Sequence, residues 1–502
     1  MSTSGDSPRF RTLPLLWTAA FVAVSALLLF WGSWGGSLYN SDDYIYLDFA
    51  RGMRETGDWL ELRFQGVVFH QRPPLSTWLL AVSTELLGDT PFAARLPSIL
   101  MGLAGLWLTV LVTRRLLRDE ATALLAAGLV LATHLFYFHV RGATSDATLF
   151  AGLMAFLFFH LRFDGRWRDA LGLGLALGWM LMTKGVVAVL PAALAMVHWM
   201  ARRRWDLLRS PRLPAALVLA LALALPWHLA MTLRHGAAFW EEYIGFNVLA
   251  RAGGSLFFEA DPLYYVRRLL LHEGVLPYLY VAGLVAGVLR LQRRRDAADL
   301  FLFLWLLVLF LPFQLSSTRL YHYLLPSVPA LSVLAARTAA PILHRPWGLP
   351  AALVAALGLF LGNNLAHLDA EYSGDQRRFA DAVRAEAADP AVRVFSLNRY
   401  ELAFFHLTGR PVRMITTDPG GRDALLSLPE FSRTRTVEFL EHPALEVFLA
   451  EGPFVCITDP PSLPLLCGPD PASCRGGRAR VVAGVRALLV VGEGPGGRGR
   501  GP

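Results

Sequence analysis

Residues 37–78 read SLYNSDDYIYLDFARGMRETGDWLELRFQGVVFHQRPPLSTW. This is the most polar stretch in the N-terminal two-thirds of the chain, and it follows the first long apolar run. It holds the adjacent carboxylates Asp42 and Asp43, a Gly57-Asp58 turn and the cationic diproline Arg72-Pro73-Pro74. A polar stretch in this position predicts a loop between membrane spans that carries ionisable groups at the membrane surface.

The composition indicates a polytopic membrane protein. The 502 residues are 54% hydrophobic and 17% charged, with a mean hydropathy of +0.43, whereas a soluble protein is about 25% charged. The apolar residues gather in runs of roughly 15–22 residues, which is long enough to cross a bilayer. The net charge of +8 comes mostly from Arg in short loops between these runs, so it does not predict binding of nucleic acid.

We predict about eleven spans, and the Arg residues between them give the orientation. The expected spans are 13–34, 92–113, 121–140, 147–163, 168–183, 185–201, 213–233, 273–291, 298–315, 321–340 and 348–366. Every second connection is rich in Arg, as in TRRLLRDE, ARRRWDLLRSPR and RLQRRRD. These connections should face the cytoplasm. The N-terminus is then inside, and the chain after residue 366 is outside.

The stretch Leu171–Met200 has two interpretations. It could form one long helix, or two short spans that meet at Thr183-Lys184-Gly185. One helix would place ARRRWDLLRSPR on the outer face, against the charge bias. We therefore predict two short spans whose tip lies slightly below the outer surface.

The other connections should meet on the outer face. They are the loop of Asp42, residues 139–146, 183–185, 234–272 and 316–323. Ionisable groups near a bilayer are costly and usually mark a pathway or a site. The 234–272 loop resembles an amphipathic interfacial segment. Its Arg251, Glu259 and Asp261 are weak candidates for the site.

The chain after the last span is predicted to form a small extracytoplasmic α/β domain. Residues 374–388 have helical spacing, and 393–397 and 453–458 have the pattern of short strands. The expected organisation is a membrane domain at 1–368 with a first outer loop at 37–90, an α/β domain at 369–488 and a disordered tail at 489–502. A disulfide between Cys467 and Cys474 is possible if this end is extracytoplasmic.

Three carboxylates are candidates for catalysis. Asp42 and Asp43 could simply cap a helix that begins near Tyr44, or one of them could be a general base. A neighbouring carboxylate and partial desolvation would raise its pKa toward a useful range. Asp146 follows Thr144 and Ser145 at the start of a span, so a helix N-cap is the slightly favoured interpretation. The alternative is a second carboxylate of the site.

The cationic candidates would bind a phosphate. Arg72 could merely precede a proline-stiffened helix start, or it could aim a planar guanidinium at a phosphate. Lys184 could reach toward the membrane surface or bind a lipid phosphate. Arg319 and His322 are either interfacial anchors or part of the same site. The sequence contains no P-loop, GxGxxG or metal-ligand spacing, so soluble nucleotide-sugar donors are not indicated.

Taken in order, these residues resemble the GT-C class of polyprenyl-phosphate-sugar glycosyltransferases. The resemblance is to family 39-type protein mannosyltransferases, to the aminoarabinose transferase that acts on lipid A, and to the RgtA/B/C/D-like domain. It covers residues 13 to 340. Its landmarks are Asp42-Asp43 with Tyr46, GDW at 57–59, RPP at 72–74, Gly88 with Ala94-Arg95, RGATSD ending at Asp146, TKG at 183–185, LPW at 225–227 and SSTRLYHYLLP at 316–326.

The resemblance implies a GT-C fold and a glycosyltransferase of the plasma (inner) membrane with an extracytoplasmic site. The donor would be a polyprenyl-phosphate sugar, and the acceptor a lipid, a glycan or a protein. By resemblance Asp42 is the catalytic base, Arg72 and Lys184 bind the donor phosphate, and Asp146 holds the acceptor or the base. The acidic pair is Asp-Asp here, whereas Asp-Glu is usual.

The resemblance does not carry over a metal site. In the aminoarabinose enzymes a Glu just before the Lys-Pro takes part in such a site, and Gln71 stands at that position here. No cofactor is therefore assigned, although a divalent metal is compatible with the class. Two rival functions are a lipid or sugar transporter, which would favour charges at mid-bilayer and an internal repeat, and a non-catalytic scaffold. No clear repeat is present.

Overall fold

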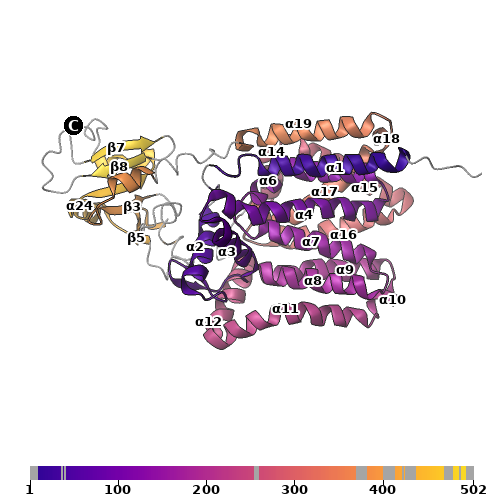
Figure 1. The fold of residues 1–502 in the computed structure, drawn as a ribbon, viewed down its shortest axis with the longest axis horizontal. Coiled ribbons are helices and arrows are strands. Elements are labelled where there is room, and N and C mark those ends of the chain that lie inside the picture. The colour runs from indigo at the N-terminus through magenta and orange to yellow at the C-terminus, as the bar shows by residue number, and fades with distance from the viewer. Residues whose placement is uncertain are drawn as a thin grey trace, which may run out of the picture. The chain divides into compact units, whose positions relative to one another are not determined.

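The computed structural model describes residues 9–35, 38, 41–253, 259, 261–368, 381–398, 413–420, 423, 437–467, 479–484 and 488–492. The chain divides into two compact units. Unit 1 comprises residues 1–33 and 70–369, and unit 2 comprises residues 34–69 and 370–502. Figure 1 draws both units as ribbons, and each is described by itself below.

Unit 1 is a bundle of long apolar helices, and each expected span falls on a helix or on a pair of helices. They are α1 (Arg9–Phe30), α4 (Pro91–Leu117), α5 (Glu120–Ala132) with α6 (His134–Val140), α7 (Asp146–Arg162), α8 (Trp167–Lys184), α9 (Val189–Ala201), α11 (Arg212–His235), α15 (Leu276–Arg294), α16 (Ala297–Leu315), α17 (Val328–Thr338) and α19 (Gly348–Leu368). The protein is a multi-pass membrane protein with an α-helical core, as predicted.

The number of spans stays a prediction. By length and hydropathy, five described helical runs are long and apolar enough to cross a membrane. They are Pro91–Leu117, Trp167–Ala201, Arg212–His235, Ala297–Leu315 and Gly348–Leu365, and α5 with α6 adds a sixth if that bent pair is one span. Shorter helices must therefore contribute if the bundle has about eleven spans.

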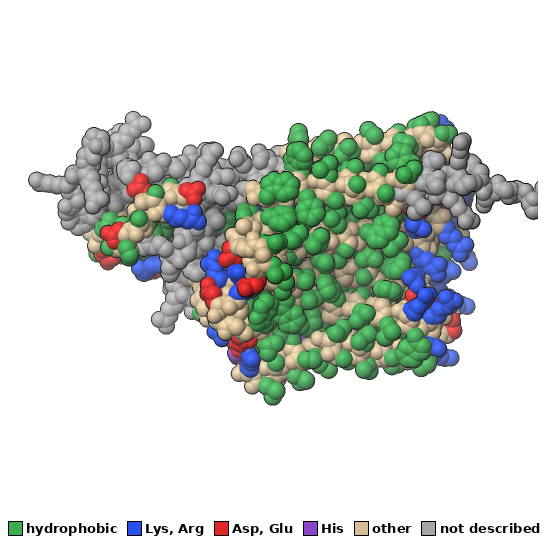
Figure 2. All heavy atoms as spheres, viewed as in Figure 1, with side chains coloured by type: hydrophobic (Ala, Val, Ile, Leu, Met, Phe, Trp, Pro, Cys, Tyr) green, Lys and Arg blue, Asp and Glu red, His purple; other side chains and the backbone are tan. Residues whose placement is uncertain are grey.

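The surface of unit 1 has the charge pattern of a membrane protein. Figure 2 shows an apolar flank along the helices, and Lys and Arg side chains gathered at the end that carries α10 (Trp205–Leu208) and α18 (Ala340–Leu343). Arg202, Arg203 and Arg204 lie at this end, directly before α10. We refer to it as the Arg-rich end. Arg clusters of this kind face the cytoplasm in most membrane proteins.

The chain turns back between α8 and α9, as the two-span interpretation predicts. The 3-10 turn η1 (Gly185–Ala188) separates the two helices. At the far end of α9, His198 Nδ1 lies 2.8 Å from His160 Nε2, near the end of α7. The Trp199 ring also packs against Phe163, just before α8 begins. Because the last residues of α9 lie beside the start of α8, Lys184 is at the tip of a helical hairpin.

The expected span 121–140 is broken. The axes of α5 and α6 differ by 72°, and the break lies at Thr133. This residue has an extended backbone (φ −69°, ψ 134°), and its hydroxyl accepts a hydrogen bond from the Phe136 N–H at the start of α6. Thr133 is thus the N-cap of a new helix, which the apolar run alone does not reveal.

The other helical elements of unit 1 lie in two connections. One holds α3 (Leu75–Leu87), which starts after Pro74, so the interpretation of the diproline as a helix start is confirmed. The other holds α12 (Ala237–Trp240), the π-helix η2 (Glu241–Ala250), α13 (Arg251–Gly253) and α14 (Tyr264–His272). A π-helix of this length is rare and often occurs at a functional site. The short 3-10 helix η3 (Tyr321–Ser327) precedes α17.

Unit 2 combines a helix and hairpin from residues 34–69 with a C-terminal sheet. Helix α2 (Ser41–Thr56) buries Tyr46, Phe49 and Met53. Strands β1 (Leu62–Phe64) and β2 (Val67–Phe69) form an antiparallel hairpin. Its turn is Gln65-Gly66, where both residues have positive φ.

The C-terminal residues form a six-stranded mixed sheet in the order β5-β4-β3-β6-β8-β7. The strands are β3 (Arg393–Leu397), β4 (Arg413–Thr416), β5 (Val437–Phe439), β6 (Phe454–Thr458), β7 (Ala479–Gly484) and β8 (Leu488–Gly492). Strands β3 to β6 pair in parallel, and β8 is antiparallel to β6 and β7. The short helices are α24 (His442–Ala450), η5 (Pro460–Ser462) and α25 (Pro464–Cys467). The α/β prediction agrees with this sheet.

The domain division stays a prediction, and two of its expected boundaries differ from the described elements. The tail is expected to begin at residue 489, whereas Leu488–Gly492 forms β8, which pairs with β6 and β7. Residues 37–69 are expected in the membrane domain, whereas they group with unit 2. Of the expected helix 374–388, residues 381–388 are described, and 381–386 are helical. The Cys467–Cys474 pairing lies outside the described residues.

Candidate active site

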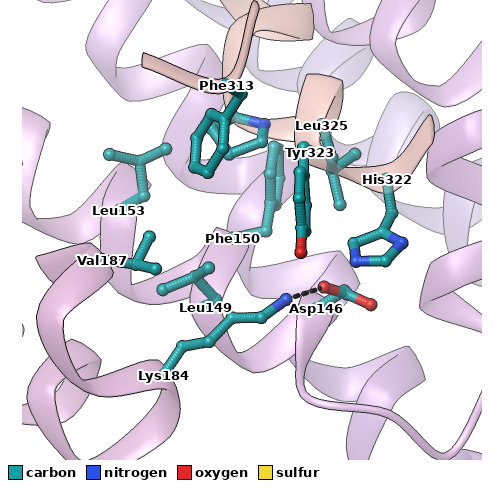
Figure 3. A pocket seen from close by; sticks show the side chains of 11 residues that line it. Asp146, Leu149, Phe150, Leu153, Lys184, Val187, Phe313, His322, Tyr323 and Leu325 are labelled. Carbon is teal, nitrogen blue, oxygen red and sulfur yellow. Dashed lines mark hydrogen bonds and ion pairs between the residues drawn. The ribbon is translucent and has the colours of Figure 1, made fainter. Parts of the chain in front are cut away.

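An ion pair between Asp146 and Lys184 forms the centre of the candidate site in unit 1. Asp146 is the first residue of α7 and Lys184 is the last residue of α8. The two helices are antiparallel neighbours, so these ends meet away from the Arg-rich end. Lys184 Nζ lies 2.7 Å from Asp146 Oδ1 (Figure 3). Asp146 is buried, whereas the Lys184 side chain is 26% exposed.

Further polar groups surround the other oxygen of Asp146. The Thr144 hydroxyl donates to Asp146 Oδ2 over 3.1 Å, and His139 Nδ1 lies 3.3 Å from the same atom. The His322 ring is 5.4 Å from the His139 ring, measured between centroids, and it lines the same pocket as Asp146 (Figure 3). His139, which sequence reasoning placed in an outer loop without singling it out, is thus a member of the site.

An apolar pocket adjoins this polar cluster. Its apolar lining includes Leu149, Leu153, Val187 and Phe313. These four residues also line a second hollow, which continues to Met180, Leu190, Pro191 and Leu309. The pockets therefore form a groove between α7, α9 and α16. One end of this groove is charged and the rest is apolar, which suits an amphiphilic ligand.

Arg319 does not join this pocket. Its Nη1 donates to the backbone carbonyls of Glu259 and Asp261 over 3.1 and 2.5 Å, and its Nε donates to the carbonyl of Gln314 over 3.1 Å. The guanidinium therefore holds the 259–261 segment against the end of α16. Three of its bonds thus go to backbone carbonyls, and a role of Arg319 in phosphate binding stays a prediction.

Tyr323 and Arg251 extend the polar cluster toward the 234–272 connection. Arg251 Nη1 lies 3.3 Å from the Tyr323 hydroxyl. The carbonyl of Arg251 accepts from Thr318 N–H over 3.2 Å and from the Ser316 hydroxyl over 3.3 Å. These bonds join the end of η2 to the loop that carries His322.

The Arg72 segment is tied to the π-helix. His70 Nδ1 lies 3.0 Å from Glu242 Oε2. Asn247 Nδ2 donates to the Gln71 carbonyl over 2.7 Å. Arg72 itself is half-buried. These contacts fix the backbone just before Arg72. They also hold η2 next to the diproline.

The turn after Lys184 needs a glycine. Gly185 has φ +59°, a conformation that L side chains rarely adopt, and a Cβ atom there would overlap the Tyr243 hydroxyl. That hydroxyl lies 3.0 Å from His228 Nε2. The TKG pattern at 183–185 is thus explained by the approach of η2 to the tip of the hairpin.

Asp42 and Asp43 lie in the first turn of α2, in unit 2. Asp42 is half-buried and Asp43 is fully buried. Acidic residues in the first helical turn are stabilised by the helix dipole, so the capping interpretation and the catalytic one both stay open. The roles of both residues remain predictions.

Unit 2 also contains a buried carboxylate that sequence reasoning missed. Asp48 follows the acidic pair on α2, and its Oδ2 accepts from the Gln65 N–H over 2.5 Å. Burial raises the pKa of Asp48 to about 6, although that hydrogen bond and Arg51 act in the opposite direction. Its spacing of three and four residues from Ile45 and Tyr44, which are buried on the same face of α2, was the available signal.

Among the described residues, no group of three His, Cys, Asp or Glu side chains is placed to hold a metal ion. At the diproline, the residue before Arg72 is Gln71, and the carboxylate nearby, Glu242, is already engaged with His70. These residues do not fit the metal site that the resemblance would suggest.

Known proteins were compared with the chain. Residues 71–229 match the family of dolichyl-phosphate-mannose-protein mannosyltransferases. An undecaprenyl phosphate-alpha-4-amino-4-deoxy-L-arabinose arabinosyl transferase of Pseudomonas aeruginosa (strain LESB58) is 31% identical over 308 residues, which are 59% of this chain and 55% of that protein. The chain thus spans about half the length of the curated relatives that it matches.

Solved structures show the fold. The crystal structure of ArnT from Cupriavidus metallidurans bound to undecaprenyl phosphate matches with a TM-score of 0.72 and 20% identity, over 95% of this chain and 98% of that one. The chain has the GT-C glycosyltransferase fold. The archaeal oligosaccharyltransferase AglB from Archaeoglobus fulgidus also matches, with a TM-score of 0.57 and 14% identity, over 90% of this chain and 70% of that one.

The comparisons confirm the predicted relationship to protein mannosyltransferases and aminoarabinose transferases. The family match covers three of the expected site residues, Arg72, Asp146 and Lys184, and it begins after Asp42. The GT-C fold therefore agrees with the sequence prediction.

Proposed function

We propose that the protein transfers a sugar from a polyprenyl-phosphate donor to a lipid, glycan or protein acceptor. Its relatives include transferases whose names specify undecaprenyl phosphate-linked aminoarabinose, so a pentosyl donor of this kind is the first to test. The transporter alternative is less favoured because the relatives are transferases. The charged groups of the site also lie at helix ends, where Asp146 begins α7 and Lys184 ends α8.

The observation that carries the proposal is a charged pair at the end of an apolar groove. A polyprenyl phosphate has one anionic head and a long hydrocarbon tail. Lys184 offers a partly exposed ammonium for the phosphate. The pockets along α7, α9 and α16 offer apolar side chains to the prenyl units next to that head.

The reaction is a single displacement at the anomeric carbon. The acceptor oxygen or nitrogen forms a bond to that carbon while the bond from the carbon to the phosphate oxygen breaks. The acceptor proton passes to a carboxylate, for which we assign Asp42, and the electron pair of the broken bond stays on the polyprenyl phosphate. Lys184 and Arg72 stabilise the charge that develops on this leaving group.

Asp146 has a positioning role in this proposal. Its two oxygens already accept from Lys184 and Thr144, and His139 lies beside them. A carboxylate with this many partners is better suited to orient groups than to collect a proton in the reaction. It holds the Lys184 ammonium at the mouth of the groove, where the donor phosphate arrives.

The site is proposed to face the outside of the plasma membrane. Asp146 and Lys184 lie at the helix ends opposite to the Arg-rich end, and Arg-rich loops are retained in the cytoplasm. A donor presented in the outer leaflet would then enter the groove from the membrane, and the acceptor would approach from the extracytoplasmic side.

The test is transfer in proteoliposomes. The probe is undecaprenyl-phospho-4-amino-4-deoxy-L-arabinose with a radiolabelled sugar, supplied with extracted envelope lipids, glycans and proteins in separate reactions. We expect label in one acceptor pool with the wild type and none with Asp42→Asn. Glu55→Gln, which removes an exposed carboxylate from the end of the same helix, should transfer normally. Normal transfer by Asp42→Asn would remove Asp42 from the role of base.

If the wild type transfers no sugar from this donor, a second donor is tested. The same reactions are run with polyprenyl-phospho-mannose, because the family match is to mannosyltransferases. Absence of transfer from both donors, with the protein folded, would contradict the proposed function.

A further inference from the structure

Glu273 is a buried carboxylate in the connection between α14 and α15, outside the cluster around Asp146. It is fully buried. Its two oxygens accept hydrogen bonds from the backbone N–H groups of His134 and Leu135, over 2.7 and 2.9 Å. The Tyr321 hydroxyl donates to it over 2.5 Å. Three donors from two distant segments therefore converge on one side chain.

These two segments carry the histidines of the site. His134 and Leu135 are the first residues of α6, and His139 lies in the last turn of the same short helix. Tyr321 is the first residue of η3 and directly precedes His322. Both elements are short, so a bond at their first residues controls where the histidines lie relative to Asp146.

The helix break at Thr133 makes this connection necessary. Where α5 stops, its last carbonyls and the first N–H groups of α6 lose helical partners. Asn363 Nδ2 donates to the carbonyl of Ala132 over 3.0 Å, and Glu273 receives the two N–H groups on the other side of the break. Without these partners the break would bury unsatisfied backbone groups, which is costly.

We propose that Glu273 is a positioning residue that holds α6 and η3 in register, so that His139 and His322 are placed beside Asp146. This inference rests on the proposed function, because it assigns Glu273 to the preparation of the same site. Glu273 does not touch the pocket lining, and its effect on transfer acts through the two histidine-bearing segments.

The chemistry requires acceptors on both oxygens. An ionised carboxylate accepts at each oxygen, whereas a glutamine amide has one acceptor oxygen and one NH₂ donor. In Glu273→Gln, whichever way the amide is turned, a donor would face a backbone N–H or the Tyr321 hydroxyl. The substitution keeps the volume of the side chain but removes one of its two acceptor oxygens. It therefore tests the hydrogen bonds of Glu273 separately from its packing.

The experiment compares Glu273→Gln and Tyr321→Phe with Ser332→Ala. The control removes a buried hydroxyl that lies 3.4 Å from the Tyr280 hydroxyl, between α15 and α17, and makes no hydrogen bond to Glu273. We expect kcat for sugar transfer to fall about ten- to hundredfold in Glu273→Gln, because misplacement of site groups by about 1 Å has effects of this size. KM for the donor should change little, because Lys184 and Arg72 keep their places.

A second measurement is independent of transfer. The rates at which diethylpyrocarbonate modifies His139 and His322, followed by mass spectrometry, should rise in Glu273→Gln and stay at the wild-type values in Ser332→Ala. Tyr321→Phe should raise the rate for His322 more than for His139. If the wild type transfers sugar and Glu273→Gln has wild-type kcat and histidine reactivity, the inference is wrong.

The two readouts also separate this inference from the proposed function. Loss of transfer in the wild type contradicts the function, and the histidine rates then decide the positioning role alone. A fall in kcat that Ser332→Ala shares to the same extent, with unchanged histidine reactivity, would assign Glu273 to general stability and overturn the proposal.

Discussion

Removal of Lys184 should leave Asp146 as a buried charge without its ion-pair partner, and a double-mutant cycle can measure the consequence. The variants are Lys184→Met, Asp146→Asn and the two together. Lys184→Met keeps an unbranched side chain of similar length in the tip of the hairpin, and Asp146→Asn keeps the size of the side chain at the start of α7. The cycle therefore isolates the interaction between the two groups.

The magnitude follows from the burial and the remaining partners. Breaking a fully buried ion pair by removing one partner costs about 3–5 kcal/mol. Here Lys184 is 26% exposed, and Thr144 and His139 still face Asp146. We therefore expect Lys184→Met to lower the free energy of unfolding by about 2 kcal/mol, with a coupling of about 1–2 kcal/mol to Asp146→Asn.

The assay is denaturant-induced unfolding in lipid–detergent micelles, followed by tryptophan fluorescence. The double variant should be more stable than the sum of the single effects predicts, because it removes the charge that Lys184→Met leaves unpaired. Effects that add within about 0.5 kcal/mol would refute the reasoning, since Asp146 and Lys184 would then be stabilised independently.

Two further predictions concern other parts of the fold. Gly185→Ala should lower the melting temperature and the rate of sugar transfer, because the added Cβ would overlap the Tyr243 hydroxyl. Gly236→Ala is the control, because Gly236 has a similar φ of +56° but open space where a Cβ would lie, so it should show only the smaller backbone effect. Equal losses in the two variants would contradict this explanation. The folded-state pKa of Asp48 is about 6, above its ordinary value of 3.8, so its protonated form is favoured by folding. Protonation of Asp48 therefore stabilises the folded state fully below pH 3.8, and this stabilisation is lost as the pH rises through 6. The free energy of unfolding should fall by up to about 3 kcal/mol over this range. Asp48→Asn should therefore flatten the pH dependence of melting between pH 4 and 6. Glu55→Gln should change it much less, because Glu55 makes the smallest contribution to the raised pKa of Asp48. Identical curves for wild type and Asp48→Asn would show that Asp48 is not buried in the way described.

The apolar helices and the turn at Lys184 could be predicted because they depend on local patterns. A bilayer demands apolar runs of a set length, and Arg-rich loops report their orientation. The same rules gave two short helices around Lys184, and the contact between His198 and His160 confirms that the chain returns there. Ordered short motifs were enough to relate the chain to the GT-C class.

The pairing within the site could not be predicted from sequence spacing. Asp146 and Lys184 were both candidates, but nothing in the sequence states that one side chain reaches the other across α7 and α8. His139 and Glu273 were missed because their roles depend on the break at Thr133, where a single hydroxyl starts a new helix.

The measurement that tests the account most directly is the affinity of purified protein for undecaprenyl phosphate. Wild type is compared with Lys184→Met and with Arg290→Met, which breaks a similar ion pair of 2.7 Å to the buried Asp299 near the Arg-rich end. Loss of a charge-assisted bond to the phosphate is worth about 1.5–3 kcal/mol, so Lys184→Met should raise Kd by about ten- to hundredfold. Arg290→Met should bind like the wild type. Equal Kd values for Lys184→Met and the wild type would show that the groove beside Asp146 does not receive the donor phosphate.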